Sequence, residues 1–415
     1  MIHFGIVSPP VSGHIHPFAA LGRELQSRGH RVTYFQVVDL EQKIGSEDIG
    51  FWAVGQSDHP KGSLPESLAR LGQLKGTSAL RFTIRAIERT TVMMCRDLPD
   101  AVKSAGVEAL LVDQMEPVGG AVAERLRLPF ITVCNALAIN TELQVPPPFT
   151  PWQYSSASWT RWRNKLGYAV SARLTKPVAA VVAKYRAEWK LPAHRTMDES
   201  FSPLAQICQM PREFDFPRAE LPETFHYVGP LRRDPPRPPA FPWERLDGRP
   251  LVYASLGTLQ NSRAPVFRSF AEACRGLNVQ LVLSHGGGLT KADEETLPGA
   301  PLVVSYAPQF ELLARASATI THAGLNTVLD SLTNGVPVVT VPITYEQPAI
   351  ARRVERAGAG QSISMGRLTP ARLRNALQAV LEQPRYREAA QKIAAGTRTA
   401  GGVARAAEII ESALD

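Results

Sequence analysis

The chain has 415 residues, of which 44% are hydrophobic and 20% are charged, and its formal net charge is +8. This length is too great for one ordinary domain and predicts two or three domains with sizeable apolar cores. No apolar run is long enough to span a membrane, no secretory signal opens the sequence, and the four cysteines show neither metal-ligand nor disulfide spacing. The sequence therefore predicts a protein of the reducing cytoplasm without a metal site.

The first half of the chain alternates strands with helices. Residues 4–8 and 31–37 are apolar runs typical of strands, and the helix between them is predicted to begin near Pro17, because proline suits the first turn of a helix. Two further strands are predicted over residues 107–113 and 128–135, again with a helix between them. This alternation predicts an α/β fold with a doubly wound parallel sheet.

Two polar residues of this half stand where predicted strands end. His14 lies in the loop after the first strand, and Asp113 ends a later strand of the same sheet. Both can reach the crevice at the carboxyl ends of the strands. A neutral imidazole suits a general base near pH 7, the adjacent helix start disfavours its protonation, and a carboxylate can fix its tautomer. A lone histidine here is ordinarily a helix cap, but Asp113 favours a catalytic pair.

Residues 151–190 carry eight lysines and arginines against one glutamate, with four tryptophans among them. A basic, aromatic surface favours contact with an anionic membrane at its inner face. The favoured interpretation is nevertheless a solvated helical face whose tryptophans pack inward. Nucleic acid is not an expected partner, because no recognition motif accompanies the positive charge.

Residues 229–247 differ in character from the rest of the chain, with six prolines and little periodicity. Such a composition predicts a stiff, extended linker. The alternation of strands and helices restarts after it. We therefore expect one Rossmann-like domain over residues 1–228 and a second over 248–395, facing each other across a cleft.

Residues 306–347 contain three predicted strand ends, each followed by polar side chains, and so outline one pocket. Tyr306 offers a flat face on which a base can stack, and the backbone of Ala307 can hydrogen-bond the base edge. Asp330, about one turn into the helix that follows the second of these strands, is an acceptor suited to a ribose diol. These positions predict a nucleoside site.

The same segment also offers groups for phosphate and for a sugar. The helix start after the second strand suits phosphate, because free N–H groups and the positive end of the helix dipole lie there. The residues expected at this helix start are His322, Gly324, Asn326 and Thr327. Glu346 and Gln347, after the third strand, suit sugar hydroxyls. The predicted ligand is a nucleotide sugar.

This segment resembles the donor-binding box of the family 1 UDP-glycosyltransferases. It carries the family's APQ, His-x-Gly-x-Asn-Thr and GVP motifs and its Glu-Gln pair in order. Four positions depart from the usual pattern. Tyr306 stands where Trp is usual, Leu325 where plant members have Trp, Asp330 where Glu is usual, and Glu346 where Asp is common. Tyrosine should preserve stacking, whereas the shorter Asp330 weakens the expected ribose contact and Glu346 leaves the sugar open.

The resemblance implies further features of the fold and the site. It adds Gln309 and Leu325 to the donor-binding residues, and it places a Ser-x-Gly-Thr turn near the diphosphate. That turn comprises Ser255, Gly257 and Thr258. The resemblance also supports His14 as the catalytic base within a Gly-His-x-x-Pro setting. It implies the two-domain GT-B arrangement, in which a last helix in residues 396–415 crosses back to the first domain.

These features predict an inverting glycosyltransferase that moves a hexose from a UDP-sugar, expected to be UDP-glucose, to a hydroxyl of a lipophilic small molecule. No Asp-x-Asp motif occurs, so we expect metal-independent transfer without a cofactor. The segments FGIVSPP and ASLGTLQN are similar to those of bacterial members that act on macrolides or on carotenoids such as zeaxanthin. The alternatives are a nucleotide-sugar epimerase or hydrolase on the same fold and an inactive partner protein.

The acceptor site is expected to include the segment over residues 144–162. This long connection between two strands is rich in proline and aromatic residues, and Phe149 and Trp152 offer rigid faces to a planar or polyene-like acceptor. Ordinary packing of these rings into the core is the alternative.

Overall fold

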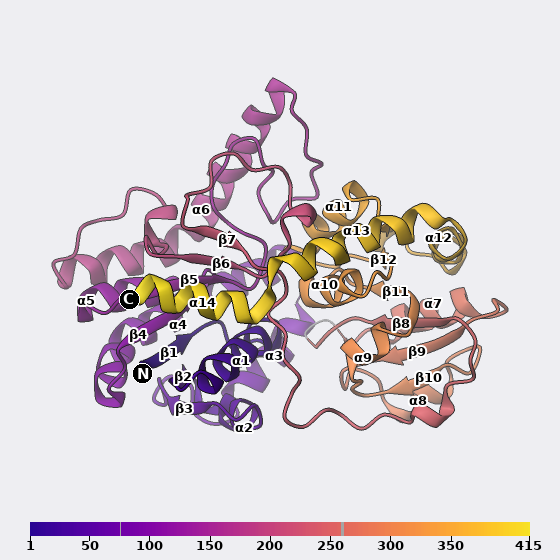
Figure 1. Cartoon of the computed structure of the whole chain (residues 1–415), viewed down its shortest axis with the longest axis horizontal. Helices are drawn as coiled ribbons and strands as arrows, with labels where there is room; N and C mark the ends of the chain where they lie inside the picture. Colours follow the sequence, from indigo (N-terminus) through magenta and orange to yellow (C-terminus); the bar gives the residue numbers. More distant parts are fainter. Residues whose placement is uncertain (75, 259–260) are drawn as a thin grey trace.

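The computed structural model describes residues 1–74, 76–258 and 261–415. Leu259 and Gln260, within the ASLGTLQN segment, lie outside the described residues. Two parallel sheets, one in each half of the chain, organise the molecule, and helices cover both faces of each sheet (Figure 1). This arrangement confirms the predicted doubly wound α/β fold. Within the described residues, no helix is long and apolar enough to cross a membrane.

The first sheet has the order β3-β2-β1-β4-β5-β6-β7, and all of its strands are parallel. Its strands are β1 (His3–Val7), β2 (Arg31–Gln36), β3 (Gly50–Ala53), β4 (Ala109–Asp113), β5 (Phe130–Cys134), β6 (Gln206–Cys208) and β7 (Phe225–Tyr227). The helices of this half are α1 (Ser12–Ser27), α2 (Glu41–Gly45), α3 (Ser63–Gln73), α4 (Gly76–Ala105), α5 (Gly119–Leu126) and α6 (Ser158–Glu188), with 3-10 turns η1 (Val38–Leu40), η2 (Asp198–Ser200) and η3 (Arg212–Phe214).

The second sheet has the order β10-β9-β8-β11-β12-β13 and is also parallel throughout. Its strands are β8 (Leu251–Ser255), β9 (Gln280–Ser284), β10 (Leu302–Val304), β11 (Ala316–Thr321), β12 (Val338–Thr340) and β13 (Gly360–Ser362). The remaining helices are α7 (Ala264–Cys274), α8 (Lys291–Glu295), α9 (Gln309–Leu313), α10 (Leu325–Thr333), α11 (Gln347–Arg356), α12 (Pro370–Glu382), α13 (Pro384–Ala400) and α14 (Gly402–Leu414), with 3-10 turns η4 (Trp243–Arg245) and η5 (Met365–Arg367).

Helix α1 begins earlier than the sequence predicts. Its first residue is Ser12, after Val11 in an extended conformation, and Pro17 lies inside the helix. Proline lacks an N–H, so the Gly13 carbonyl four residues earlier receives no helical hydrogen bond from it. The prediction of a start near Pro17 is therefore wrong, and His14 belongs to the first helical turn rather than to a loop.

One apolar core joins the two halves of the chain. Leu137 and Met210, from the side of the first sheet, pack in the same buried cluster as Val328 and Ile350 from the second half. Each sheet also has its own core. Because a shared core resists separation, the contact between the halves resembles a domain interior more than a loose hinge.

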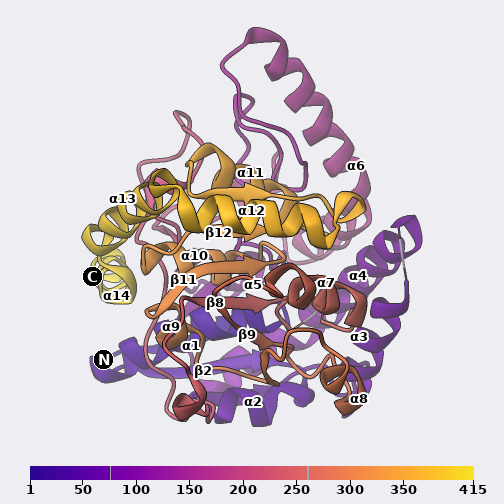
Figure 2. The same ribbon diagram turned by 90° about the vertical axis from the view of Figure 1, so that its right-hand side faces the viewer.

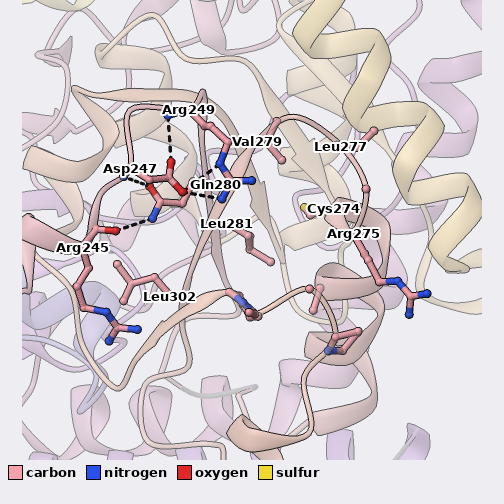
Figure 3. Close-up of a pocket in the computed structure, with 16 residues that line it drawn as sticks. Arg245, Asp247, Arg249, Cys274, Arg275, Leu277, Val279, Gln280, Leu281 and Leu302 are labelled. Carbon is pink, nitrogen blue, oxygen red and sulfur yellow. Dashed lines mark hydrogen bonds and ion pairs between the residues drawn. The ribbon is translucent and has the colours of Figure 1, made fainter.

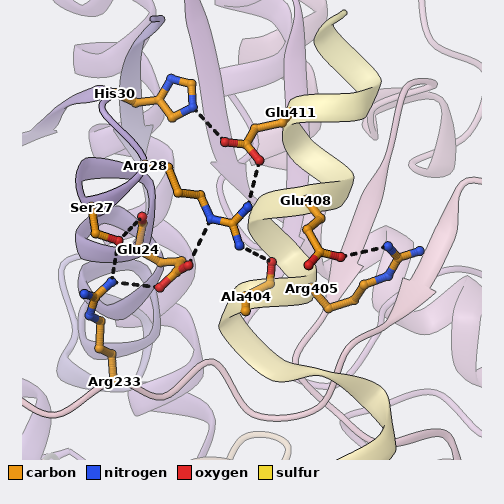
Figure 4. Close-up of polar contacts among 9 residues, drawn as sticks. All are labelled: Glu24, Ser27, Arg28, His30, Arg233, Ala404, Arg405, Glu408 and Glu411. Carbon is orange, nitrogen blue, oxygen red and sulfur yellow. Dashed lines mark hydrogen bonds and ion pairs between the residues drawn. The ribbon is translucent and has the colours of Figure 1, made fainter.

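Helix α14 lies on the first half of the molecule, against α1 (Figure 4). Its residues Ile409 and Ile410 are buried in the core of the first sheet. Glu411 accepts hydrogen bonds from Arg28 at 2.9 Å and from the His30 ring at 3.0 Å. The chain bends between α13 and α14 at Gly401, which has a φ of 87°. The boundary predicted between residues 395 and 396 therefore falls inside α13.

The proline-rich linker is anchored at both ends and exposed between them. Leu231 is buried in the core of the first sheet, and Phe241 is buried beside strands of the second. Residues 233–240 are exposed, as expected for an extended segment, and Arg233 at its start pairs with Glu24 of α1 at 2.7 Å.

Candidate active site

The predicted pair in the first half stands where the strand order of the sheet reverses. Residue Val7 of β1 pairs with Val112 of β4, so His14 and Asp113 follow neighbouring strands. The corresponding reversal in the second sheet lies between β8 and β11, where Ser255 pairs with Thr321. Ligands of open α/β sheets bind at such switch points.

His14 and Asp113 form a hydrogen-bonded pair. The His14 Nδ1 lies 2.7 Å from Asp113 Oδ2, and the Asp113 side chain is fully buried. The second carboxylate oxygen, Oδ1, accepts a hydrogen bond from the Met115 backbone N–H at 2.8 Å. An ionised Asp113 can only accept at Oδ2, so the His14 proton resides on Nδ1 and the lone pair of Nε2 is left for a substrate proton.

The electrostatics of His14 differ from the sequence-based expectation. Burial lowers the pKa of His14, but the charge of Asp113 and the hydrogen bond to it outweigh burial, so the pKa lies above its ordinary value. The expectation that the helix start governs this pKa and lowers it is therefore wrong. A carboxylate in direct contact exceeds the partial charge of a helix terminus.

His322 is enclosed by two glycines. A Cβ atom on Gly324 would lie 2.6 Å from the imidazole Cε1, and one on Gly257 would lie 2.8 Å from the same atom. Burial lowers the pKa of His322 to about 4, against a smaller raising effect from the Ser255 backbone. The ring is therefore neutral near pH 7, and it can serve a diphosphate as a hydrogen-bond donor rather than as a cation.

Helix α10 presents an uncapped N-terminus at the end of β11. Gly324 is its N-cap residue, and no side chain of the described residues caps the first turn, which contains Asn326 and Thr327. The Asn326 side chain is not free, because its Nδ2 donates to the Gly13 carbonyl at 2.8 Å and its Oδ1 accepts from Gln209 at 3.0 Å. Backbone N–H groups are thus the groups that α10 can offer to an anion.

The predicted ribose acceptor, Asp330, is buried and already engaged. Its Oδ2 accepts from Gln309 Nε2 at 2.7 Å, and its Oδ1 accepts from Arg232 of the linker at 2.6 Å. The Gln309 amide oxygen in turn accepts from the Thr327 hydroxyl at 3.2 Å. The structure therefore brings Gln309, Thr327 and Asp330 together, and it adds Arg232.

Tyr306 and the turn after β8 lie at the open side of this site. The Tyr306 side chain is exposed, and its hydroxyl donates to the Gly286 carbonyl at 3.3 Å. Ala307 is half-buried and Thr258 is exposed. The Ser255 hydroxyl accepts from the backbone N–H of Gly257 at 3.2 Å, which shapes the turn.

The residues after β12 have mixed positions. Glu346 is half-buried, and its carboxylate accepts from the Leu137 N–H of the first half at 3.1 Å. Burial raises the pKa of the Glu346 carboxyl, although the Leu137 hydrogen bond opposes the shift. The Gln347 side-chain oxygen accepts from two backbone N–H groups of its own loop. Leu325 is buried in the core shared by the two halves, so its side chain is a packing group.

The two predicted acceptor residues differ in exposure. Phe149 is exposed, whereas Trp152 is half-buried against α6, where a Cβ atom on Gly167 would lie 2.8 Å from its ring. The Arg163 guanidinium lies 4.9 Å from the centre of the Trp152 ring. The Pro151 carbonyl accepts from Arg352 of α11 at 2.9 Å, which ties this segment to the second half.

A separate cavity of about 220 Å³ lies at the other end of the second sheet (Figure 3). Its lining includes Arg249 just before β8, Gln280 at the start of β9 and Leu302 at the start of β10. These are amino ends of strands, whereas His322 follows the carboxyl end of β11. The cavity is therefore not the candidate site.

Three residues of the site were missed by the sequence reasoning. Asn135 Nδ2 donates to Asp113 Oδ2 at 2.9 Å, Gln209 contacts both Asn135 and Asn326, and Arg232 pairs with Asp330. Asn135 ends a predicted strand, which is the signal that could have found it. Gln209 follows the three-residue strand β6, and Arg232 lies in the linker, where no pattern marks a site residue.

Comparisons with known proteins agree with this geometry. The family model for UDP-glucoronosyl and UDP-glucosyl transferases matches residues 70–396. Zeaxanthin glucosyltransferases from Pantoea ananas and Pseudescherichia vulneris are 37% and 36% identical, covering 100% of this chain and 96% and 98% of those proteins.

Solved structures confirm the GT-B arrangement. The glycotransferase of kitacinnamycin is similar with a TM-score of 0.77 and 23% identity, covering 99% of this chain and 98% of that one. The calicheamicin glycosyltransferase is similar with a TM-score of 0.74 and 23% identity, covering 100% of this chain and 98% of that one. The chain is a glycosyltransferase and belongs to the UDP-glucoronosyl and UDP-glucosyl transferase family.

Proposed function

We propose that this enzyme is an inverting, metal-independent transferase that moves glucose from UDP-glucose to a hydroxyl of a lipophilic small molecule. The observation that carries the proposal is the hydrogen-bonded pair of His14 and Asp113 beside the N-terminus of α10, whose Asn326 donates to the Gly13 carbonyl at 2.8 Å. The two zeaxanthin glucosyltransferases support a carotenoid or similar polyene as the acceptor class. Both are transferases, which disfavours an epimerase, a hydrolase or an inactive partner.

The proposed reaction is a single displacement. The acceptor oxygen forms a bond to the anomeric carbon while His14 Nε2 takes the hydroxyl proton, and the bond from that carbon to the diphosphate oxygen breaks. UDP leaves with the electron pair of that bond. Asp113, at 2.7 Å from Nδ1, stabilises the imidazolium that forms. Attack from the opposite side inverts an α-linked donor to a β-glycoside.

The donor is proposed to lie along the carboxyl ends of the second sheet. Tyr306 stacks on the base, Asp330 and Gln309 take the ribose, and His322 with the N–H groups of α10 takes the diphosphate. Negative charge that develops on the leaving group is met there by donors already in place. We expect the rate to be unchanged in excess chelator, and a loss of activity that magnesium restores would contradict this part of the proposal.

Replacement of His14 tests the proposal directly. His14→Ala is expected to lower kcat by about 100-fold or more, because a general base contributes on that scale. UDP binding, measured by calorimetry, should be nearly unchanged. His16→Ala is the matched control, since His16 lies one half-turn further along α1, is half exposed and pairs with Glu47 instead. Near-normal turnover of His14→Ala with a hydroxyl acceptor would contradict the assignment.

The acceptor is proposed to enter beside residues 144–162, with Phe149 and Trp152 against it. Phe149→Ala is expected to raise the acceptor KM and to leave the KM for UDP-glucose unchanged. A lower thermal stability with unchanged acceptor kinetics would assign the segment a packing role.

We also propose that the exposed side of α6 contacts an anionic membrane, from which a lipophilic acceptor can be drawn. Helix α6 and the segment before it project beyond the rest of the molecule (Figure 2). An apolar stripe at helical spacing runs along the exposed side. It comprises Trp159, Trp162, Leu166, Val170 and Leu174, whose exposed fractions are 62%, 74%, 66%, 52% and 42%.

The charge of α6 complements such a surface. Exposed Arg161, Lys165, Arg173 and Lys176 lie among the apolar residues. The Lys165 ammonium lies 5.4 Å from the centre of the Trp162 ring. Exposed tryptophans among basic residues suit the headgroup region of a membrane, where rings enter the interface and cations meet anionic lipids. The inward packing weighed from the sequence does not hold for Trp159 and Trp162.

Vesicle binding tests this contact. The protein should co-sediment with vesicles of phosphatidylcholine and phosphatidylglycerol, less so at high salt, and the double variant Trp159→Ser with Trp162→Ser should not. Trp52→Ser is the control, because Trp52 is a half-exposed tryptophan outside α6. Equal sedimentation of the double variant and the wild type would contradict the proposal.

A further inference from the structure

Two buried amides connect the His14–Asp113 pair to helix α10. Asn135 Nδ2 donates at 2.9 Å to Asp113 Oδ2, the same oxygen that His14 contacts. The backbone carbonyl of Asn135 accepts from Gln209 Nε2, which also donates at 3.0 Å to Asn326 Oδ1. The two amides therefore bridge the base in one half and the donor-binding helix in the other.

The connection closes on itself at Gly13. Asn326 Nδ2 donates at 2.8 Å to the Gly13 carbonyl, and Gly13 directly precedes His14. That carbonyl is free because Pro17, four residues later, has no N–H to donate to it. The backbone beside His14 is thus held by Asn326, while its side chain is held by Asp113.

Stability alone does not explain why these two amides are buried. Asn135 and Gln209 are 3% and 0% exposed, yet the oxygens Asn135 Oδ1 and Gln209 Oε1 have no hydrogen-bond partner among the described residues. A buried polar atom without a hydrogen-bond partner destabilises the folded state, because its contact with water is lost and not replaced. Strain or cost of this kind tends to persist at functional sites.

We propose that Asn135 and Gln209 are positioning residues that couple the donor-binding helix to the orientation of the base; this inference rests on the proposed function. Gln209 fixes the Asn326 amide with its oxygen toward the first sheet, so Nδ2 must face Gly13. Asn326 then serves the donor through its backbone and the base through its side chain. His14 is held in line with the anomeric carbon only while α10 occupies its donor-binding position.

The variant Gln209→Met tests the coupling, because it keeps the side-chain length and removes both hydrogen bonds. We expect kcat to fall about 10- to 100-fold, the scale of a misplaced reacting group, with the affinity for UDP unchanged by calorimetry. Gln206→Met is the matched control. Gln206 is a buried glutamine at the start of β6, and its amide oxygen accepts from Asn140 at 2.9 Å rather than from the bridge.

A second variant, Asn135→Leu, tests the contact between the two bridging amides and Asp113. It removes one donor from the Asp113 carboxylate, which strengthens the remaining interaction with the His14 imidazolium. We expect the acid limb of the profile of kcat/KM against pH to move to higher pH. Gln209→Met should leave the limb in place and lower the plateau. A purely structural role moves neither of these readouts.

The outcomes separate this inference from the proposed function. If His14→Ala is inactive while Gln209→Met keeps full kcat, the base assignment stands and the coupling is overturned. If Gln209→Met and Gln206→Met lose thermal stability and kcat alike, the effect belongs to packing and the coupling is again overturned. If His14→Ala keeps its activity, the proposed function is contradicted, and the coupling that rests on it is overturned with it.

Discussion

At the scale of single residues, the contact between His14 and Asp113 makes a prediction about pH. The base acts in its neutral form, so a pKa raised above 6.5 by Asp113 places the acid limb of the profile above that value. Asp113→Asn removes the negative charge and should move the limb to lower pH, while lowering the plateau because the imidazolium loses its counter-charge. The measurement is kcat/KM against pH.

Glu108→Gln is the control for that experiment, because Glu108 is another carboxylate beside a strand of the same sheet but contacts the His3 N–H instead. It should leave the profile unchanged. If the Asp113→Asn limb stays at the wild-type pH, the carboxylate does not set the His14 pKa.

Residues of the site could be predicted from the sequence where chemistry and position coincide. His14 and Asp113 are titratable groups at the ends of recognisable strands. Asn135 also stands at the end of a predicted strand, but an amide cannot transfer a proton, so its residue type does not indicate a catalytic role. Gln209 follows a strand of three residues, which is too short to show a pattern. The partners of Asp330 come from residues far away in sequence, which a single sequence does not reveal.

At the scale of elements, the start of α10 predicts a steric effect. Gly324→Ala would bring a Cβ to 2.6 Å from the half-buried His322 ring, which would have to shift from its place. We expect the KM for UDP-glucose to rise about tenfold or more, because the displaced His322 imidazole no longer donates a hydrogen bond to the diphosphate. Calorimetric titration with UDP should show the same loss.

The control for this variant is Gly366→Ala, since a Cβ atom at Gly366 meets nothing within 4 Å. Loss of the N-cap glycine itself should cost no more than about 1 kcal/mol of unfolding free energy. Wild-type affinity for UDP in Gly324→Ala would mean that the His322 ring is not a donor ligand.

Elements were predictable where burial imposed a regular pattern. The strands β1, β2, β4 and β5 stand out as apolar runs because they are buried on both faces. The start of α1 was misplaced, because proline is usual in a first turn and the compensating contact from Asn326 lies in the other half of the chain. For α6 the sequence left two interpretations open, and the exposure of Trp159 and Trp162 decides which face the rings occupy.

At the scale of the whole molecule, two sheets and a linker were expected, but the shared core was not. Its members come from both halves, and no periodicity within either half shows that they meet. The ion pair of Asp215 and Arg353 lies at this contact, with both side chains 1% exposed and 2.8 Å between Oδ1 and Nη2. Arg218 and Tyr227 donate to the other oxygen of that carboxylate, Oδ2.

The shared core predicts cooperative unfolding. If the two halves share one interior, calorimetry should show a single transition, and Arg353→Ala should lower the unfolding free energy by about 3–5 kcal/mol, because it leaves Asp215 buried with one cation fewer. Arg275→Ala is the control, because Arg275 pairs with Glu272 within the second half. Both side chains of this pair are exposed, and such pairs contribute at most about 1 kcal/mol. Two separate transitions in the wild type, or equal losses in the two variants, would show that the halves fold independently and that the contact is only a docking surface.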